Sequence, residues 1–232
     1  MNIELRQQLG LTKQPVAIGF LEKAPEGLEA WQGGAVPAGC SFWRAAWEGK
    51  SFYTVAADHY NCAVGAYTHA ISVPAERGNV LMDTIGFMVG SGYLRMAEVP
   101  GIPVLPSTPA FVAYAPAGQA GFAPDVVLVA AKPASAMLLY EAAVLAGAGD
   151  ALTQTLGRPG CAVLPLALKT GVSAVSFGCK GNRTFTGLPE EELYLAIPGA
   201  KWEAVVAAAA GIVAANGTME AHYKAHQAAV QG

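Results

Sequence analysis

Short apolar runs alternate along the chain with segments whose apolar residues recur at helical spacing. Runs of roughly four to eight apolar residues between glycines or prolines are typical of buried strands, and a longer period is typical of helices. This alternation predicts the α/β class, with mixed sheets flanked by helices. The runs that predict strands are PVAIGFL (15–21), SFYTVA (51–56), FVAYAP (111–116), PDVVLVAA (124–131), VSAVSF (172–177) and ELYLAIP (192–198).

The segments between these runs predict helices. The clearest is KPASAMLLYEAAVLAG, because Pro133 suits a first helical turn and Gly147 suits the residue after a helix. GCKGNR (178–183) predicts a tight loop instead, since glycine and asparagine favour turns. The further helices are expected at 3–11, 41–49, 63–70, 74–96, 162–169 and 199–216, followed by a polar helical tail.

The same order of features occurs twice. In each half a strand leads to a Gly-Cys pair, a helix, a second strand and a second cysteine. This order predicts two pseudo-symmetric α/β lobes from an internal duplication, packed as one compact unit. The expected lobes are 1–105 and 106–232, the second with the helical tail, and the proline-rich segment 99–109 is the expected linker. Because the halves align only with gaps, chance similarity is the alternative.

Composition narrows the class of protein. Hydrophobic residues make up 53% of the chain and charged residues 13%, which favours a homo-oligomer that covers apolar surface. The net charge is −3 without a basic cluster, which argues against a nucleic-acid binder. We expect no membrane span, because the Ala-rich run 204–215 is shorter than the roughly 20 residues that a span needs. The N-terminus lacks the features of a signal peptide, so we expect a cytoplasmic protein.

Four cysteines carry the candidate chemistry. Cys40, Cys62 and Cys161 each precede an expected helix, and Cys179 lies in a glycine-flanked loop. A helix start favours a thiolate, which is the form that binds metals and attacks electrophiles. The chain has four cysteines, and four thiolates are the number that binds a 4Fe-4S cluster or a tetrahedral zinc ion. The alternative is that the cysteines only fill gaps in the core.

Long motifs resemble a known family. They are DHYNCAVGAYTH (58–69), FAPDVVLVAAKPASAMLLYEAA (122–143), GRPGCAVLPLALKTG (157–171) and VSFGCKGNRTFTGLPEEELYLAIPG (175–199). From about Pro15 to Pro198 the chain resembles a bacterial and archaeal family known only as domain of unknown function 169. That resemblance implies no reaction. It does imply a cysteine at each of the four positions and a Gly-x-Arg turn at 181–183, which strengthens the ligand interpretation.

His59 is a further candidate because it lies between an acid and a cysteine. It could be a general base for Cys62, with Asp58 orienting its ring as in a catalytic triad. It could instead be a ligand of a cluster or a haem. The favoured interpretation is a turn that Asp58 begins, with His59 capping the backbone.

Arg183 lies close to Cys179 in the sequence. With Lys180 and Asn182 it could bind a carboxylate or phosphate beside the thiol. The alternative is an exposed turn in which Arg183 pairs with Glu190 or Glu191.

Three hypotheses follow. The first is a 4Fe-4S cluster held by Cys40, Cys62, Cys161 and Cys179, with Arg183 and His59 nearby, for electron transfer or redox chemistry on a small anion. The second is metal-free thiol chemistry at Cys62 or Cys179. The third is a non-enzymatic module that binds haem or another small molecule. Zinc or no cofactor are the remaining options, and the expected partner is a small molecule or an electron-transfer protein.

Overall fold

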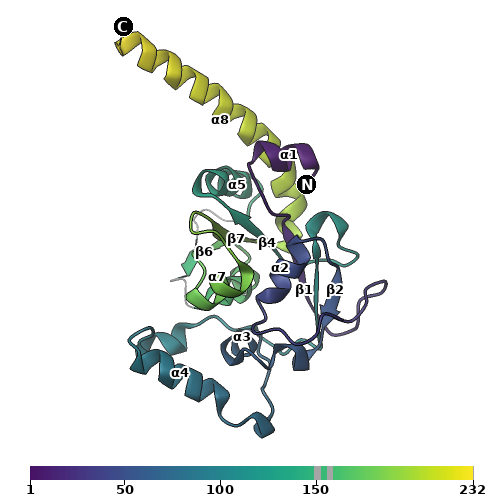
Figure 1. The fold of residues 1–232 in the computed structure, drawn as a ribbon. Coiled ribbons are helices and arrows are strands. Elements are labelled where there is room, and N and C mark those ends of the chain that lie inside the picture. The colour runs from purple at the N-terminus through teal and green to yellow at the C-terminus, as the bar shows by residue number, and fades with distance from the viewer. Residues whose placement is uncertain (149–152, 156–158, 232) are drawn as a thin grey trace.

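The computed structural model describes residues 1–148, 153–155 and 159–231, and its strands form one sheet (Figure 1). The sheet has seven strands in the order β2-β3-β1-β4-β7-β6-β5. It is mixed, because β5 and β6 are parallel and the other pairs are antiparallel. The expected α/β class is therefore confirmed, with a single sheet running through both expected lobes. The strands are Val16–Leu21 (β1), Phe52–Thr54 (β2), Phe111–Pro116 (β3), Val126–Ala131 (β4), Thr153–Thr155 (β5), Ala174–Ser176 (β6) and Leu193–Pro198 (β7).

The two halves meet at the centre of the sheet, where β1 pairs with β4. Ala17 lies opposite Val127, and the pairing is antiparallel. On either side the pattern is the same: β1 pairs along its length with β3, and β4 along its length with β7. The short strands β2 and β6 then flank β3 and β7. The order expected from a duplication is thus present in the topology, while the duplication itself stays a prediction. The expected boundary between the lobes at residue 105 also stays a prediction. It would separate β3 from its neighbours β1 and β2 in the sheet.

The central strands are buried on both faces, which explains their continuous apolar runs. In β4, Val126 and Leu128 pack on one face and Val127 and Val129 on the other. The first face is covered by α2 (Ser41–Trp47) and α6 (Val163–Thr170). The second face is covered by α1 (Ile3–Gln8), α5 (Pro133–Leu145) and α8 (Trp202–Gln231).

The segment between β2 and β3 leaves the sheet. It forms α3 (Ala63–Thr68) and α4 (Val80–Gly90), which lie together at one end of the molecule (Figure 1). The helix expected over 74–96 is thus wrong in extent. It ends at Gly90 because Gly92 adopts a positive φ of 74°.

The tight loop expected at 178–183 is also wrong. Residues from Lys180 form helix α7 (Lys180–Thr186). The helix can begin there because the Cys179 side chain caps it, accepting a hydrogen bond from the Asn182 N–H. Cysteine is not among the usual capping residues, so the sequence pattern gave no sign of this helix start.

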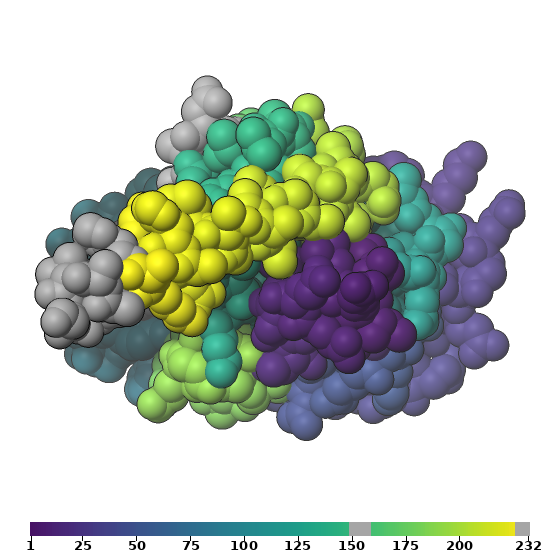
Figure 2. Space-filling model, turned by 90° about the horizontal axis from the view of Figure 1, so that it is seen from above, coloured from purple at the N-terminus to yellow at the C-terminus, as the bar shows by residue number. Residues whose placement is uncertain are grey.

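Helix α8 is longer than expected and projects beyond the body of the protein (Figure 1). Figure 2 shows α1 lying against the part of α8 that is nearest the body of the protein. The stretch from Gly199 to Ala225 is long and apolar enough to cross a membrane, with a mean hydropathy of 1.4 and 11% of its best window buried. The Ala-rich run 204–215 was too short when it was counted alone. In the structure the polar tail continues the same helix, which makes the whole stretch longer. One such helix is a weak signal, and the absence of a membrane span stays a prediction.

Gly199 is a position where any side chain should destabilise the fold. Its N–H donates to the Asp125 carbonyl at 2.8 Å, and a Cβ there would overlap the Pro124 carbonyl oxygen. We expect Gly199→Ala to lower the free energy of unfolding by on the order of 3 kcal/mol, measured by urea denaturation. Gly118 follows the matching strand β3 and has open space around it, so Gly118→Ala is the control. Equal effects of the two substitutions would contradict this packing.

Candidate functional site

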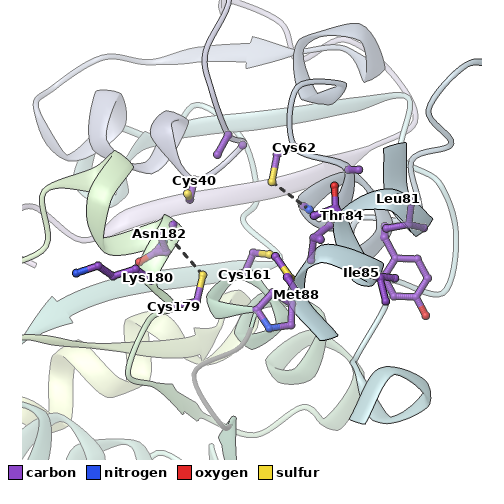
Figure 3. Close-up of a pocket in the computed structure, with 18 of the residues that line it drawn as sticks. Cys40, Cys62, Leu81, Thr84, Ile85, Met88, Cys161, Cys179, Lys180 and Asn182 are labelled. Carbon is purple, nitrogen blue, oxygen red and sulfur yellow. Dashed lines mark hydrogen bonds between the residues drawn. The ribbon is translucent and has the colours of Figure 1, made fainter. Parts of the chain in front are cut away.

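All four cysteines line one cavity of about 480 Å³ (Figure 3). Cys40 and Cys62 come from the first half of the chain, and Cys161 and Cys179 from the second. Cys40 and Cys161 also pack against the core on the sheet face that α2 and α6 cover. The structure therefore brings together thiols that lie far apart in the sequence. Their role as ligands stays a prediction.

Each cysteine is held at the start of a helical segment. Cys62 caps α3 and Cys179 caps α7 in the same way, because each sulfur accepts a backbone N–H three residues ahead. The donors are Gly65 at 3.3 Å and Asn182 at 3.4 Å. Cys40 directly precedes α2, and Cys161 lies in a 3₁₀ turn directly before α6. The two pairs of cysteines thus occupy matching places in the two halves.

One hydrogen bond to sulfur crosses between the halves. The Thr68 hydroxyl, on α3, lies 3.3 Å from the Cys161 sulfur. It also lies 2.9 Å from the Gly65 carbonyl oxygen. Thr68 is fully buried, so its single proton is directed to one of these two acceptors.

Burial disfavours the thiolate form of three of the four cysteines. It raises the pKa of Cys40 to about 12, and the neighbouring Cys62 and Cys179 add to that shift, while the Asn182 amide acts against it. Burial also raises the pKa of Cys62, and it raises that of Cys161 well above its usual value. The thiolates expected from the helix starts are therefore not favoured at these three positions, because desolvation outweighs the N–H donors.

The thiols surround the cavity rather than converging on a point. Among the residues that the structure describes, no three His, Cys, Asp or Glu side chains are close enough to hold one metal ion. A zinc ion bound at about 2.3 Å from four sulfurs would bring those sulfurs within about 4 Å of one another. The choice between zinc and a larger group stays a prediction.

His59 is not among the residues that line the cavity. Its Nε2 lies 2.8 Å from the Thr54 hydroxyl, and its ring packs at 5.2 Å from that of Phe42. The Asp58 carboxylate accepts the Val55 N–H at 2.8 Å, so Asp58 lies within a 3₁₀ turn that follows Val55 and does not begin the turn as expected. The hydrogen bonds of Asp58, His59 and Cys62 therefore do not link these three residues as a catalytic triad would. His59 bonds a side chain and not the backbone, which also differs from the favoured interpretation.

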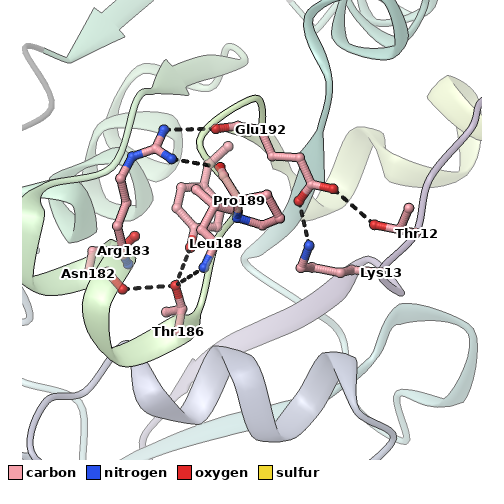
Figure 4. Close-up of polar contacts among 9 residues, drawn as sticks. Thr12, Lys13, Asn182, Arg183, Thr186, Leu188, Pro189 and Glu192 are labelled. Atoms are coloured by element: carbon pink, nitrogen blue, oxygen red, sulfur yellow. Dashed lines mark hydrogen bonds and ion pairs between the residues drawn. The ribbon is translucent and has the colours of Figure 1, made fainter.

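Arg183 does not line the cavity either. Its guanidinium donates to the backbone carbonyls of Pro189 and Glu192, each at 2.8 Å (Figure 4). It also donates to the Phe177 carbonyl at 2.6 and 2.9 Å. The Glu192 carboxylate in turn binds Lys13 and Thr12. Arg183 thus fixes the loop before β7, and the geometry supports neither an anion site nor a pair with Glu190 or Glu191.

The cavity also contains His69, which the sequence did not single out, and Asn182, which was considered only as a partner of Arg183 in an anion site. Both are almost fully buried, with exposed fractions of 1% and 3%. His69 follows Cys62 by two helical turns, and Asn182 follows Cys179 by one. Helical spacing from a cysteine was therefore the available signal, but it needed α7 to be recognised as a helix.

Helix α4 and the segment after it supply an apolar wall to the cavity. Figure 3 shows Leu81, Ile85 and Met88 of α4 across from the cysteines. Leu94 and Ile102 extend this wall. The volume and the lining are those of a small-molecule site, which is mostly apolar with a few polar groups.

The model of the family DUF169, described as "Uncharacterised ArCR", matches residues 4–208. The chain therefore belongs to this family, which confirms the resemblance seen in its motifs. No curated protein and no solved structure matches the chain. The family description names no activity, so the function has to be argued from the cavity.

The two buried histidines predict loss of stability in acid. Burial lowers the pKa of His59 to about 3 and that of His69 to about 4. The unfolded chain therefore takes up protons near its ordinary pKa of about 6.5, before the folded protein does. Their contribution is present above about pH 6.5 and is lost as the pH falls towards 4. We expect the free energy of unfolding to drop by about 2 kcal/mol per histidine between about pH 7 and pH 5, measured by urea denaturation.

His222 provides the control for this pH dependence, because it lies on an exposed part of α8. The variant His222→Gln should keep the full drop in stability. In His69→Gln the drop should shrink, whatever the stability at about pH 7. A wild-type protein equally stable at both pH values would show that the histidines are not buried in their neutral form.

Proposed function

We propose that this DUF169 protein binds a 4Fe-4S cluster through Cys40, Cys62, Cys161 and Cys179, and uses it for electron transfer or for redox chemistry on a small molecule. The observation that carries the proposal is the common cavity of the four thiols. Cysteines that only filled gaps in the core would have no reason to gather from four separate helix starts around one space. Four cysteine ligands are also the usual complement of such a cluster.

The surroundings of the sulfurs support a cluster. Backbone N–H groups already donate to Cys62 and Cys179, and the Thr68 hydroxyl is within hydrogen-bond distance of Cys161. Such donors compensate the negative charge of a cluster and set its reduction potential. The apolar wall from α4 limits the access of water to the cavity, and solvent access also affects the reduction potential of a cluster.

The raised pKa values of the thiols are compatible with this role. The positive charge of iron stabilises a thiolate more strongly than burial disfavours it, so coordinating thiols lose their protons. Cluster binding should therefore release protons and stabilise the fold. When bound, the cluster would supply an electron carrier. The protein would supply the sulfurs, their hydrogen bonds and a cavity largely shielded from water.

The alternatives have less support from the geometry. A nucleophile at Cys62 would need a low pKa, whereas burial raises it and His59 bonds to Thr54 instead. A non-enzymatic module is favoured by the apolar wall. If its ligand were haem, His69 would be the better axial ligand than His59, because it lines the cavity with an unpartnered Nε2.

The proposal predicts a coloured protein. Expression with ample iron and purification without oxygen should give a brown protein with about four iron and four acid-labile sulfide per chain. Each Cys→Ser variant should lose most of its iron. Thr84 lines the same cavity but only bonds the Val80 carbonyl, so Thr84→Val should keep the full iron content.

A colourless protein with four free thiols after anaerobic purification would falsify the cluster. A short pulse of iodoacetamide followed by mass spectrometry then separates the remaining hypotheses. One fast-labelling cysteine would support thiol chemistry. Four slowly labelling cysteines in a protein free of metal would support a binding module, since neutral buried thiols react slowly.

Thr68 should tune the cluster. If its hydroxyl donates to the Cys161 sulfur, it stabilises the more negative reduced state. We expect Thr68→Val to lower the reduction potential by on the order of tens of millivolts with full iron content, measured by a redox titration. Thr84→Val is again the control. An unchanged potential would show that the Thr68 proton stays on the Gly65 carbonyl.

A further inference from the structure

His69, which lines the cavity, carries a hydrogen-bond acceptor without a partner among the described residues. The Nδ1 of His69 lies 2.9 Å from the Gly65 carbonyl oxygen. A carbonyl oxygen only accepts, so Nδ1 carries the ring proton and Nε2 carries the lone pair. This Nε2 is buried, and no residue in the described part of the chain bonds it. The hydrogen bond to Gly65 therefore fixes the ring in the form that can accept a bond at Nε2.

A buried acceptor without a donor is costly, by about 1–3 kcal/mol. Protonation does not relieve it, because burial lowers the pKa of His69 to about 4. A donor on a bound molecule would relieve it. Asn182 also lines the cavity, and its amide interacts with the Cys40 thiol. His69 and Asn182 thus add polar groups to the wall of a mostly apolar cavity.

The charge of the cavity limits what can bind. Among the described residues that line it, Lys180 is the only charged one. Lys180 is exposed, and in Figure 3 its amine points away from the cysteines. Beside an anionic cluster, a small anion would lose its hydration without a counter-charge from the described lining, which is unfavourable. A neutral molecule therefore suits this lining better than the small anion expected near Arg183, which stays a prediction.

We propose that the apolar side of this cavity binds a neutral, mostly apolar small molecule whose hydroxyl or ring N–H donates a hydrogen bond to Nε2 of His69. This molecule is the candidate substrate of the redox centre, so the assignment rests on the proposed function. Leu81, Ile85 and Met88 contact its apolar part, and Asn182 bonds a second polar group where one is present. His69 selects for the donor, because the same molecule without it leaves Nε2 unpaired.

Indole and indene are matched probes for this site. They have nearly the same size and shape, but only indole has an N–H. On anaerobically purified protein we expect indole to bind about tenfold more tightly than indene, measured by ligand-detected NMR titration, because a hydrogen bond to a buried orphan acceptor contributes about 1.4 kcal/mol. His69→Leu should remove this preference and keep the affinity for indene. His69→Gln should keep part of it, since a glutamine oxygen can also accept.

Controls separate this proposal from the cluster. Thr184 is exposed outside the cavity and its hydroxyl bonds the Lys180 carbonyl, so Thr184→Val should bind both probes as the wild type does. Equal affinities of the wild type for indole and indene would overturn the role of His69, and so would loss of iron in His69→Gln, which would make His69 a cluster ligand. A protein without iron that still prefers indole would instead overturn the cluster and leave the binding site standing.

Discussion

The antiparallel pairing of β1 with β4 is the constraint on which the cavity depends. It joins the two halves of the chain through the pairs around Ala17 and Val127. Both strands are buried on both faces, so a slip of one residue would exchange the two cores and is strongly disfavoured. With that register fixed, the helices α2 and α6 cover the same face of the sheet, and the cysteines that precede them face one cavity.

Burial then decides the chemistry available in this cavity. It favours the neutral forms of Cys40, Cys62, Cys161 and His69, and it leaves Nε2 of His69 without a partner among the described residues. An unpaired buried nitrogen is unfavourable, and a neutral ligand with a donor would relieve it. A cluster with positively charged iron would instead stabilise the thiolate forms that burial disfavours. The two proposals therefore concern different parts of one wall and are compatible.

The strands and the clearest helix followed from sequence because their physical causes are local. Val126–Ala131 is a continuous apolar run, and Pro133 begins α5 as it should. The failures also have local causes that the pattern did not reveal. Cys179 caps α7 although cysteine is not a usual cap, and α4 ends at Gly90 within a longer apolar stretch. Short helices are marginally stable by themselves, so where α4 and α7 begin and end depends on such details.

The sequence by itself determined the family, the α/β class and a cysteine at each of four matching places. Only the tertiary structure decided that these cysteines share one cavity, that Arg183 binds loop carbonyls, and that His69 presents an unpaired nitrogen. The reason is that burial and hydrogen-bond partners are set by residues distant in the chain. Thr68 and Cys161 illustrate this, since they come into contact only when the two halves pair.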